Sequence, residues 1–237
     1  MHLVKPILKT ITPTDSRIVN TLHTRHEIFG NLVTDTKIHY DGYNRLISEI
    51  KNPFGKTLGH EIFSIDNDNK TMTGYFIETL PEYRKKGFRL GELLRLSSII
   101  TMLENKIKQL DIVSKDTAIY FHSKYKFQPS TTAFATRDNI LKNIIQNSKN
   151  PLDEIIQNAI EFIEKLKQKP SAEEQRAFTR ETNTLAKAYI ERVMAQNSQK
   201  ANPFDCAMDM RLTAQNIIEN KNFFNALFKQ HGIDYEI

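Results

Sequence analysis

Residues 80–94, LPEYRKKGFRLGELL, decide how this chain folds, because they join an apolar run to a long amphipathic segment. The apolar run, residues 72–80, is typical of a β-strand, and residues 91–106 carry apolar side chains at helical spacing. The stretch between them holds a glycine among cationic residues: Arg84, Lys85, Lys86, Gly87 and Arg89. A strand, a cationic turn and a helix start together predict an anion site, because free N–H groups and the helix dipole attract phosphate.

The composition is that of an ordinary soluble protein. Of the 237 residues, 39% are hydrophobic and 26% are charged. We find neither a run of roughly 18 apolar residues that could span a membrane nor a secretory signal. The one cysteine, Cys206, excludes an internal disulfide and fits a reducing compartment. We therefore expect a cytoplasmic protein without a membrane partner, whose formal net charge of +5 favours anionic ligands.

The order of elements predicts a mixed α/β domain. Three β-type runs lie close together and are separated by short, turn-rich breaks, which predicts an antiparallel meander. In chain order we expect a strand, a helix, the three meander strands, a helix, a strand, a helix and a strand, at residues 3–11, 14–29, 43–51, 57–66, 71–80, 91–106, 110–113, 116–125 and 127–134.

From about residue 137 the sequence becomes polar, free of glycine and helical in pattern. Ser171 and Glu174 form a capping-box pattern at a helix start. Residues 205–212 then alternate apolar and polar, as a half-buried strand does, and a last helix is expected over residues 214–230. We expect this late strand to pair with residues 127–134, so that the helices form an insertion. The alternative is a separate C-terminal helical domain.

The predicted domains follow from this interpretation. They are a core at residues 1–136, a helical insertion at residues 137–200, and a strand and helix returning to the core at residues 201–237.

The turn and the order of elements resemble the GNAT superfamily of acetyl-CoA-dependent N-acetyltransferases. The family signature at the turn is Arg/Gln-x-x-Gly-x-Gly/Ala; here Arg84 and Gly87 match it, and Arg89 replaces a small residue. A second family pattern, Asn-x-x-Ala-x-x-Leu-Tyr-x-x-x-Gly-Phe, aligns with residues 115–127. Its matches are Ala118, Phe121 and Phe127, and its departures are Lys115, His122 and Lys126.

The resemblance implies a GNAT-like central mixed sheet flanked by helices, with acetyl-CoA as the co-substrate. It implies an acyltransferase that moves the acetyl group to an amine of a protein, peptide or small molecule by direct attack in a ternary complex. In the family, amides of the turn bind the CoA pyrophosphate, and an N–H at the strand end polarises the thioester. The implied cofactor-binding residues are Ile77, Thr79, Leu80, Arg84, Lys85, Lys86, Gly87, Phe88, Arg89, Leu90, Lys115 and Ala118.

Acetyl transfer also needs a proton donor for the thiolate and a base for the amine. His122 is our first donor candidate, because imidazole exchanges a proton near neutral pH, and Tyr120 is a neighbour that can replace it. Glu78 is our base candidate, since burial in its apolar run would raise its pKa; Glu61 and Glu82 are further carboxylates near strand ends. Structural roles stay open: His122 as a helix-surface residue, and Glu78 as an edge-facing or salt-bridged one. We predict no metal site.

Two other functions stay open. The departures at Arg89, Lys115 and His122 favour a catalytically degenerate GNAT-fold protein that binds CoA or a macromolecular partner. The basic turn alone would also fit a nucleic-acid binder, although acidic residues alternate with basic ones outside the turn. The helices of residues 137–200 either select the acceptor or form a stabilising or dimerising cap, so a homodimer remains open as well.

Overall fold

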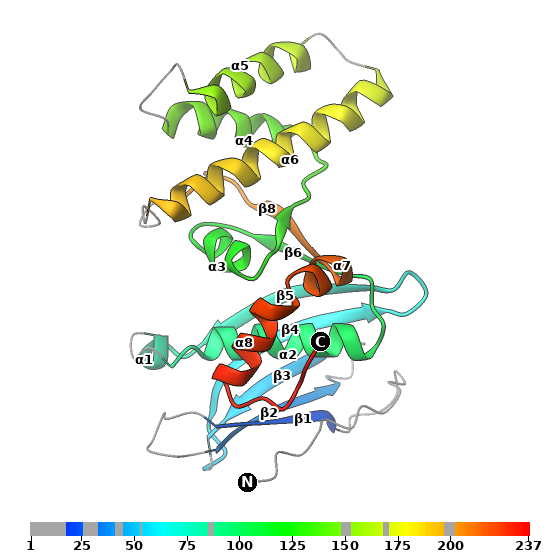
Figure 1. The fold of residues 1–237 in the computed structure, drawn as a ribbon, viewed down its shortest axis with the longest axis vertical. Helices are drawn as coiled ribbons and strands as arrows, with labels where there is room; N and C mark the ends of the chain where they lie inside the picture. The colour runs from blue at the N-terminus through cyan, green and yellow to red at the C-terminus, as the bar shows by residue number, and fades with distance from the viewer. Residues whose placement is uncertain are drawn as a thin grey trace. The chain divides into compact units, whose positions relative to one another are not determined.

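The protein divides into two compact units. A computed structural model describes residues 18–25, 33–40, 45–52, 54–84, 88–147, 153–167, 171–196 and 202–237. Unit 1 comprises residues 1–111 and 213–237, and unit 2 comprises residues 112–212. The limits fall inside β6 (Gln109–Ser114) and β8 (Met208–Thr213), so both strands run from one unit into the other (Figure 1).

Unit 1 contains an antiparallel meander, in which β1 to β5 each pair with the next strand along the chain. The turn from the fourth to the fifth strand closes on Asp66, whose Oδ1 accepts hydrogen bonds from the amides of Asp68 and Asn69. The strands are β1 (Ile18–Arg25), β2 (Val33–Tyr40), β3 (Leu46–Lys51), β4 (Thr57–Asp66) and β5 (Thr71–Thr79). The three-strand meander expected from the sequence is therefore confirmed as β3 to β5.

The helix predicted over residues 14–29 is wrong, because residues 18–25 form β1 and pair with β2. Ile18, Val19 and Leu22 lie at helical spacing, and that spacing misled the prediction. The segment is also rich in β-branched residues, which favour an extended backbone, and β2 pairs with β1 along most of its length. The strand predicted at residues 3–11 lies outside the described residues.

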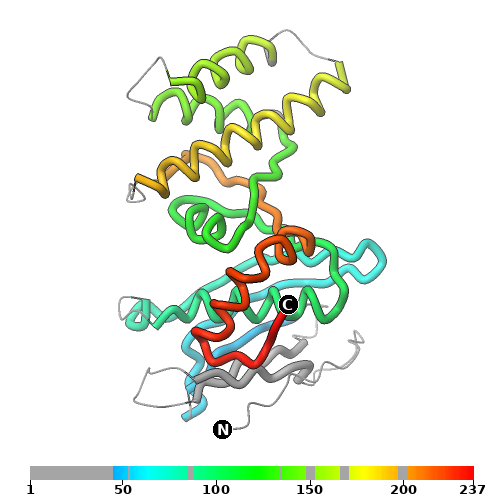
Figure 2. Tube along the Cα trace, viewed as in Figure 1, coloured from blue at the N-terminus to red at the C-terminus, as the bar shows by residue number. Residues whose placement is uncertain are grey.

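Helix α2 (Leu90–Glu104) packs on one face of this meander, as expected, and contacts β3, β4 and β5 (Figure 2). Its other side meets the C-terminal segment, where His231 lies 2.6 Å from Glu92. Because α2 is enclosed on both sides, it is buried along nearly all of its length. The core of unit 1 includes Leu46, Ile50, Leu58, Phe63, Met72, Leu93, Leu94, Leu96, Ile99, Ile100, Phe224 and Phe228.

The C-terminal segment forms two helices where the sequence predicted one. They are α7 (Ala214–Glu219) and α8 (Lys221–Gln230), and they meet at Asn220, whose backbone is outside the helical region. The Asn220 side chain donates to the carbonyl of Asn216 and so caps the end of α7.

Strand β5 carries a bulge close to the turn that follows it. Ile62 of β4 pairs with Phe76, and Phe63 pairs with Gly74, so Tyr75 is the extra residue of the β5 ladder and has no residue opposite it. Tyr75 and Phe76 are both exposed. A bulge bends a strand and re-aims its side chains, and this one lies just before the end of β5 and the short helix α1 (Pro81–Arg84).

Unit 2 contains helix α3 (Ala118–Lys124), a short strand pair and a group of mutually packed helices. Strand β7 (Gln128–Pro129) pairs antiparallel with β8, with Gln128 opposite Arg211 and Pro129 opposite Met210, so the predicted pairing of the late strand is observed. Between the paired strands the chain forms α4 (Phe134–Asn147), α5 (Glu154–Lys167) and α6 (Ala172–Ala195).

Two local sequence predictions in unit 2 can be checked directly. The capping box at Ser171 and Glu174 is present at the start of α6. The strand expected over residues 127–134 is shorter, because Pro129 lacks a ladder N–H and α4 begins at Phe134. The predicted limits of the domains, which followed sequence character, stay a prediction.

The two units together give the mixed α+β class that the sequence predicts, with helices packed on the strands and a mainly helical segment between β7 and β8. Within the described ranges, no helix is both long and apolar enough to cross a lipid bilayer.

Candidate functional site

The end of β5 and the turn after it are fixed by backbone contacts. The amide of Leu80 donates to the carbonyl of Leu58 over 2.9 Å, and the Arg84 Nε donates to the carbonyl of Thr79 over 2.8 Å. The ring of buried Tyr83 packs 5.8 Å from the ring of Phe88, which lies on the far side of the turn. Residues 85–87 lie outside the described residues, but both ends of the turn are held.

Gly59 allows β4 and β5 to approach closely at this end of the sheet. A Cβ at Gly59 would lie 2.8 Å from the Glu78 carbonyl oxygen, so no larger residue fits without a backbone shift. Gly59 of β4 pairs with Thr79 of β5, and Glu61, two residues further along β4, pairs with Ile77. The strand end expected to contact the thioester is therefore a tightly packed part of the sheet.

Helix α2 begins at the turn with an unusual residue. Arg89 is its N-cap and has a left-handed backbone (φ 55°, ψ 31°), a conformation that favours glycine. The amide of Leu93 donates to the Arg89 carbonyl in the first helical hydrogen bond, at 3.1 Å. The N–H groups of Leu90 and Gly91 precede that bond, at the start of the helix, where backbone N–H groups and the helix dipole attract anions.

The Arg89 side chain turns back onto the helix. Its Nε lies 3.0 Å from Glu92 Oε1, and its Nη2 lies 3.1 Å from Glu92 Oε2, so the two form a bidentate ion pair. Glu92 is buried and also contacts His231. The spacing of three residues between Arg89 and Glu92 is a signal that sequence reasoning missed. The contact with His231, 139 residues away, left no signal in the sequence.

The expectation that Glu78 is buried is wrong. Glu78 is exposed, and its Oε1 lies 3.4 Å from Arg84 Nη2, so the salt-bridged alternative holds. The reason is the register of the sheet: Glu78 lies opposite His60, on the face turned away from α2. Glu82 is also exposed and forms an ion pair with Lys56 at 3.2 Å.

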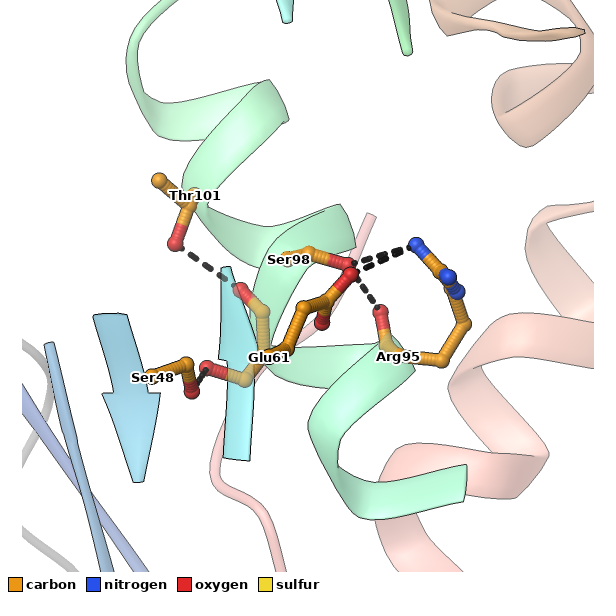
Figure 3. A network of polar contacts seen from close by, with 6 residues as sticks. Ser48, Glu61, Arg95, Ser98 and Thr101 are labelled. Carbon is orange, nitrogen blue, oxygen red and sulfur yellow. Dashed lines mark hydrogen bonds and ion pairs between the residues drawn. The ribbon is translucent and has the colours of Figure 1, made fainter. Parts of the chain in front are cut away.

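Glu61 is the buried carboxylate instead. It lies on the face of β4 that α2 covers, and Arg95 Nη1 donates to its Oε1 over 2.8 Å (Figure 3). Burial raises the pKa of Glu61, and the Arg95 charge and a hydrogen bond with Ser98 offset part of that increase. Because Glu61 is enclosed between the sheet and α2, we assign it to the packing of unit 1.

The remaining site residues lie around α3 in unit 2. Lys115 and Ala118 are exposed at the start of the helix, where the Ala118 amide donates to the Lys115 carbonyl over 3.2 Å. Tyr120 is buried, and this burial, together with the proximity of Tyr189, raises its pKa to about 12. His122 is also buried, and its ring lies 5.5 Å from that of Phe127. The alternative that His122 is a helix-surface residue is therefore wrong.

The predicted site residues therefore form two groups. In unit 1, one group surrounds the end of β5 and the start of α2: Ile77, Glu78, Thr79, Leu80, Arg84, Phe88, Arg89 and Leu90. In unit 2, the other group surrounds α3: Lys115, Ala118, Tyr120 and His122. Lys85, Lys86 and Gly87 are outside the part of the chain that the structure describes.

Comparison with other proteins gives matches to solved structures alone. No protein-family model matches this sequence, and no curated protein is similar to it. The solved structures that it matches include a GNAT-family acetyltransferase from Staphylococcus aureus (20% identity, TM-score 0.34), and this match covers 58% of that protein and 39% of this chain.

Two further matches were determined with a bound ligand. The PaiA N-acetyltransferase from Thermoplasma acidophilum, in complex with coenzyme A, is 18% identical (TM-score 0.32), and the match covers 55% of it and 37% of this chain. A GNAT-family acetyltransferase from Elizabethkingia anophelis, with acetyl-CoA bound, is 16% identical (TM-score 0.33), with 57% and 37% covered. This chain thus spans less than two thirds of the length of each of the three structures.

Proposed function

We propose that this protein is an acetyl-CoA-dependent N-acetyltransferase. The observation that carries the proposal is the junction of β5 and α2. A bulged strand with a fixed end leads into a stretch with four cationic residues, and α2 then starts at a left-handed Arg89. Such a helix start favours the pyrophosphate of a CoA thioester.

In this proposal the turn binds the phosphates, and the end of β5 binds the thioester. Lys85, Lys86 and Gly87, with Phe88, Arg89 and Leu90, supply backbone N–H groups, while Arg84 adds charge and stays tied to the carbonyl of Thr79. The backbone at Ile77, Thr79 and Leu80 carries the acetyl end. Lys115 and Ala118, exposed at the start of α3, contact the pantetheine arm.

The reaction is a direct acyl transfer. The neutral amine nitrogen attacks the acetyl carbon, the carbon–sulfur bond breaks, and the thiolate takes up a proton. Glu78, exposed at the end of β5, is proposed to take the proton that the amine loses. Its contact with Arg84 keeps it at the turn.

Two residues of α3 are candidates for the proton donor. The pKa of Tyr120, raised to about 12, keeps its phenol protonated at neutral pH, so a proton is always present for the thiolate. His122 is packed against the rings of Phe121 and Phe127. We therefore propose Tyr120 as the donor, with His122 as the alternative.

The acceptor is proposed to be an amine of a protein, peptide or small molecule, selected by the helices α4 to α6. We also propose a cytoplasmic location. If these helices form a cap instead, a homodimer is the expected consequence.

Two ion pairs favour a second function, the binding of CoA without turnover. Arg89 is neutralised by a buried carboxylate, and Glu78 is already paired with Arg84. A protein that binds CoA but transfers nothing would keep the anion site and lose the acid and base.

Calorimetry with acetyl-CoA, followed by an assay of thiol release with a panel of amines, tests both functions. Replacing Lys85 and Lys86 by Glu should weaken acetyl-CoA binding at least about tenfold, because two attractive charges become repulsive. The matched control is Arg176→Glu with Arg180→Glu, the same change of charge at exposed positions of α6.

The outcomes separate the candidates. Binding with amine-dependent thiol release supports the transferase. Binding without release from any amine supports the degenerate protein. An absence of binding at millimolar acetyl-CoA contradicts both, and retention on a filter with labelled RNA that weakens steeply with salt would then indicate a nucleic-acid binder.

A further inference from the structure

A chain of polar contacts joins the start of α2 to the end of α8. Arg89 at the turn binds Glu92 through both carboxylate oxygens, and His231 Nε2 lies 2.6 Å from Glu92 Oε1. Glu92 and His231 are both buried, whereas Arg89 is partly exposed. The C-terminal segment therefore contacts, through His231, the Glu92 carboxylate that holds the Arg89 side chain at the candidate phosphate site.

The position of His231 is set by the way α8 ends. His231 is the C-cap of α8, and Gly232 follows with a left-handed backbone (φ 66°). The Gly232 amide donates to the carbonyl of Lys229, and the Ile233 amide donates to the carbonyl of Phe228. These two bonds form a Schellman motif, and buried Ile233 anchors it. His231 is thus presented by a rigid helix end.

The hydrogen-bond direction in this chain follows from chemistry. An ionised carboxylate only accepts hydrogen bonds, so His231 Nε2 must carry the proton that it shares with Glu92. Glu92 then receives donors from opposite ends of unit 1, Arg89 at the turn and His231 at the C-terminal segment. A carboxylate held in this way has little freedom to rotate.

Arg89 keeps donors for a further anion. A guanidinium has five N–H donors, and the pair with Glu92 uses one on Nε and one on Nη2. Within the described residues, the pair leaves both donors of Nη1 and one of Nη2 for a ligand. A planar fork fixed along one edge by a carboxylate can offer its other edge to a phosphate.

We propose that the Glu92–His231 contact is a positioning device for the CoA pyrophosphate. This inference rests on the function proposed above and adds the residues that orient Arg89. Glu92 and His231 hold Arg89 in its left-handed conformation and direct its outer N–H groups toward the phosphates. The bulky Arg89 is then a phosphate ligand, and the C-terminal segment is part of cofactor recognition.

The opposite interpretation is that Arg89 blocks the phosphates because a small residue belongs at its position. The two interpretations predict opposite signs for Arg89→Gly. Glycine adopts a left-handed backbone without strain and removes the guanidinium. If Arg89 binds phosphate, Arg89→Gly weakens acetyl-CoA binding, and if Arg89 blocks the site, the same change strengthens it.

The test compares acetyl-CoA with S-acetylpantetheine, which has no phosphates, by calorimetry on the full chain. The readout is the ratio of the two affinities, because a general loss of structure lowers both. Arg89→Gly and His231→Phe should each lower the preference for acetyl-CoA roughly tenfold, the effect of one charge-assisted hydrogen bond. His231→Gln, which retains an N–H donor, should keep most of the preference.

Each outcome decides the inference. An unchanged ratio in His231→Phe, or a ratio that rises in Arg89→Gly, overturns the positioning role while the proposed transferase stands. An absence of acetyl-CoA binding by the unaltered protein overturns both. If His231→Phe does not fold, as judged by circular dichroism, His231→Ala removes the same donor without added volume and serves in its place.

Discussion

Arg95 on α2 and Glu61 on β4 form an ion pair in which Nη1 and Oε1 lie 2.8 Å apart and neither side chain is more than 2% exposed. Ser98 lies 3.3 Å from the same nitrogen, and Ser48 of β3 contacts Ser97 of α2 beside the pair (Figure 3). Charges buried between a helix and a sheet cost several kcal/mol to desolvate. Because this cost offsets the attraction between the two charges, we infer that the pair chiefly fixes where α2 lies on β4.

Arg95→Met should destabilise the protein strongly, because it leaves Glu61 buried without its cation. We expect a loss of about 3–5 kcal/mol in the free energy of unfolding, measured by urea denaturation. Combining Arg95→Met with Glu61→Leu should recover most of the loss, since neither charge is then buried. Lys142→Met removes an exposed ion pair with Asp138 and should cost less than about 1 kcal/mol. A double variant as unstable as Arg95→Met would contradict this account.

The raised pKa of Glu61 predicts an unusual dependence of stability on pH. Because burial raises this pKa in the folded state, folding favours the protonated acid. The contribution of Glu61 is therefore most favourable below its ordinary pKa of 4.5 and is lost as pH rises through the folded value. Glu61→Gln, which mimics the protonated acid, should lack this pH-dependent contribution to the free energy of unfolding. The free energy of unfolding of the unaltered protein should thus fall relative to Glu61→Gln as the pH rises above 4.5, and a constant difference would count against it.

Asn183 of α6 is expected to hold the backbone of Thr131, just after β7, in place. Its side-chain amide accepts from the Thr131 amide and donates to the Thr131 carbonyl, each over 3.1 Å, as a neighbouring strand would. Asn183→Ala leaves both backbone groups of buried Thr131 unpaired and should cost about 1–3 kcal/mol. Thr184→Ala, on the exposed next residue, is the control and should change stability by less than about 0.5 kcal/mol. Equal effects in thermal denaturation would show that Asn183 has no such role.

Much of the fold could be predicted because its signals are local. The runs of β3, β4 and β5 are bounded by turn residues, α2 repeats apolar residues at helical spacing, and Ser171 with Glu174 carries a cap pattern. The alternation of Met208, Met210 and Leu212 likewise identified β8. The prediction was wrong at β1 because its apolar residues fit both the helical and the strand period. Only the pairing with β2 decides between the two.

The site was harder to predict because its geometry depends on distant partners. A glutamate in an apolar run looks buried, yet whether it faces α2 depends on register, which puts Glu61 inside and Glu78 outside. The left-handed backbone of Arg89 follows from the start of α2, and its ion pair depends on a carboxylate that His231 also contacts. No pattern within one segment contains that information.

Tyr120 and His122 make different predictions for the proton-transfer step. If Tyr120 protonates the thiolate, Tyr120→Phe should lower kcat about 100-fold and leave acetyl-CoA affinity nearly unchanged, since the ring is kept and the proton is lost. With a pKa of about 12, Tyr120 stays protonated between pH 7 and 10, so its titration should not lower the rate in this range. Tyr189→Phe, on the neighbouring ring that helps to raise this pKa, is the matched control and should stay near the unaltered rate. A full rate in Tyr120→Phe together with a large loss in His122→Phe would transfer the role to His122.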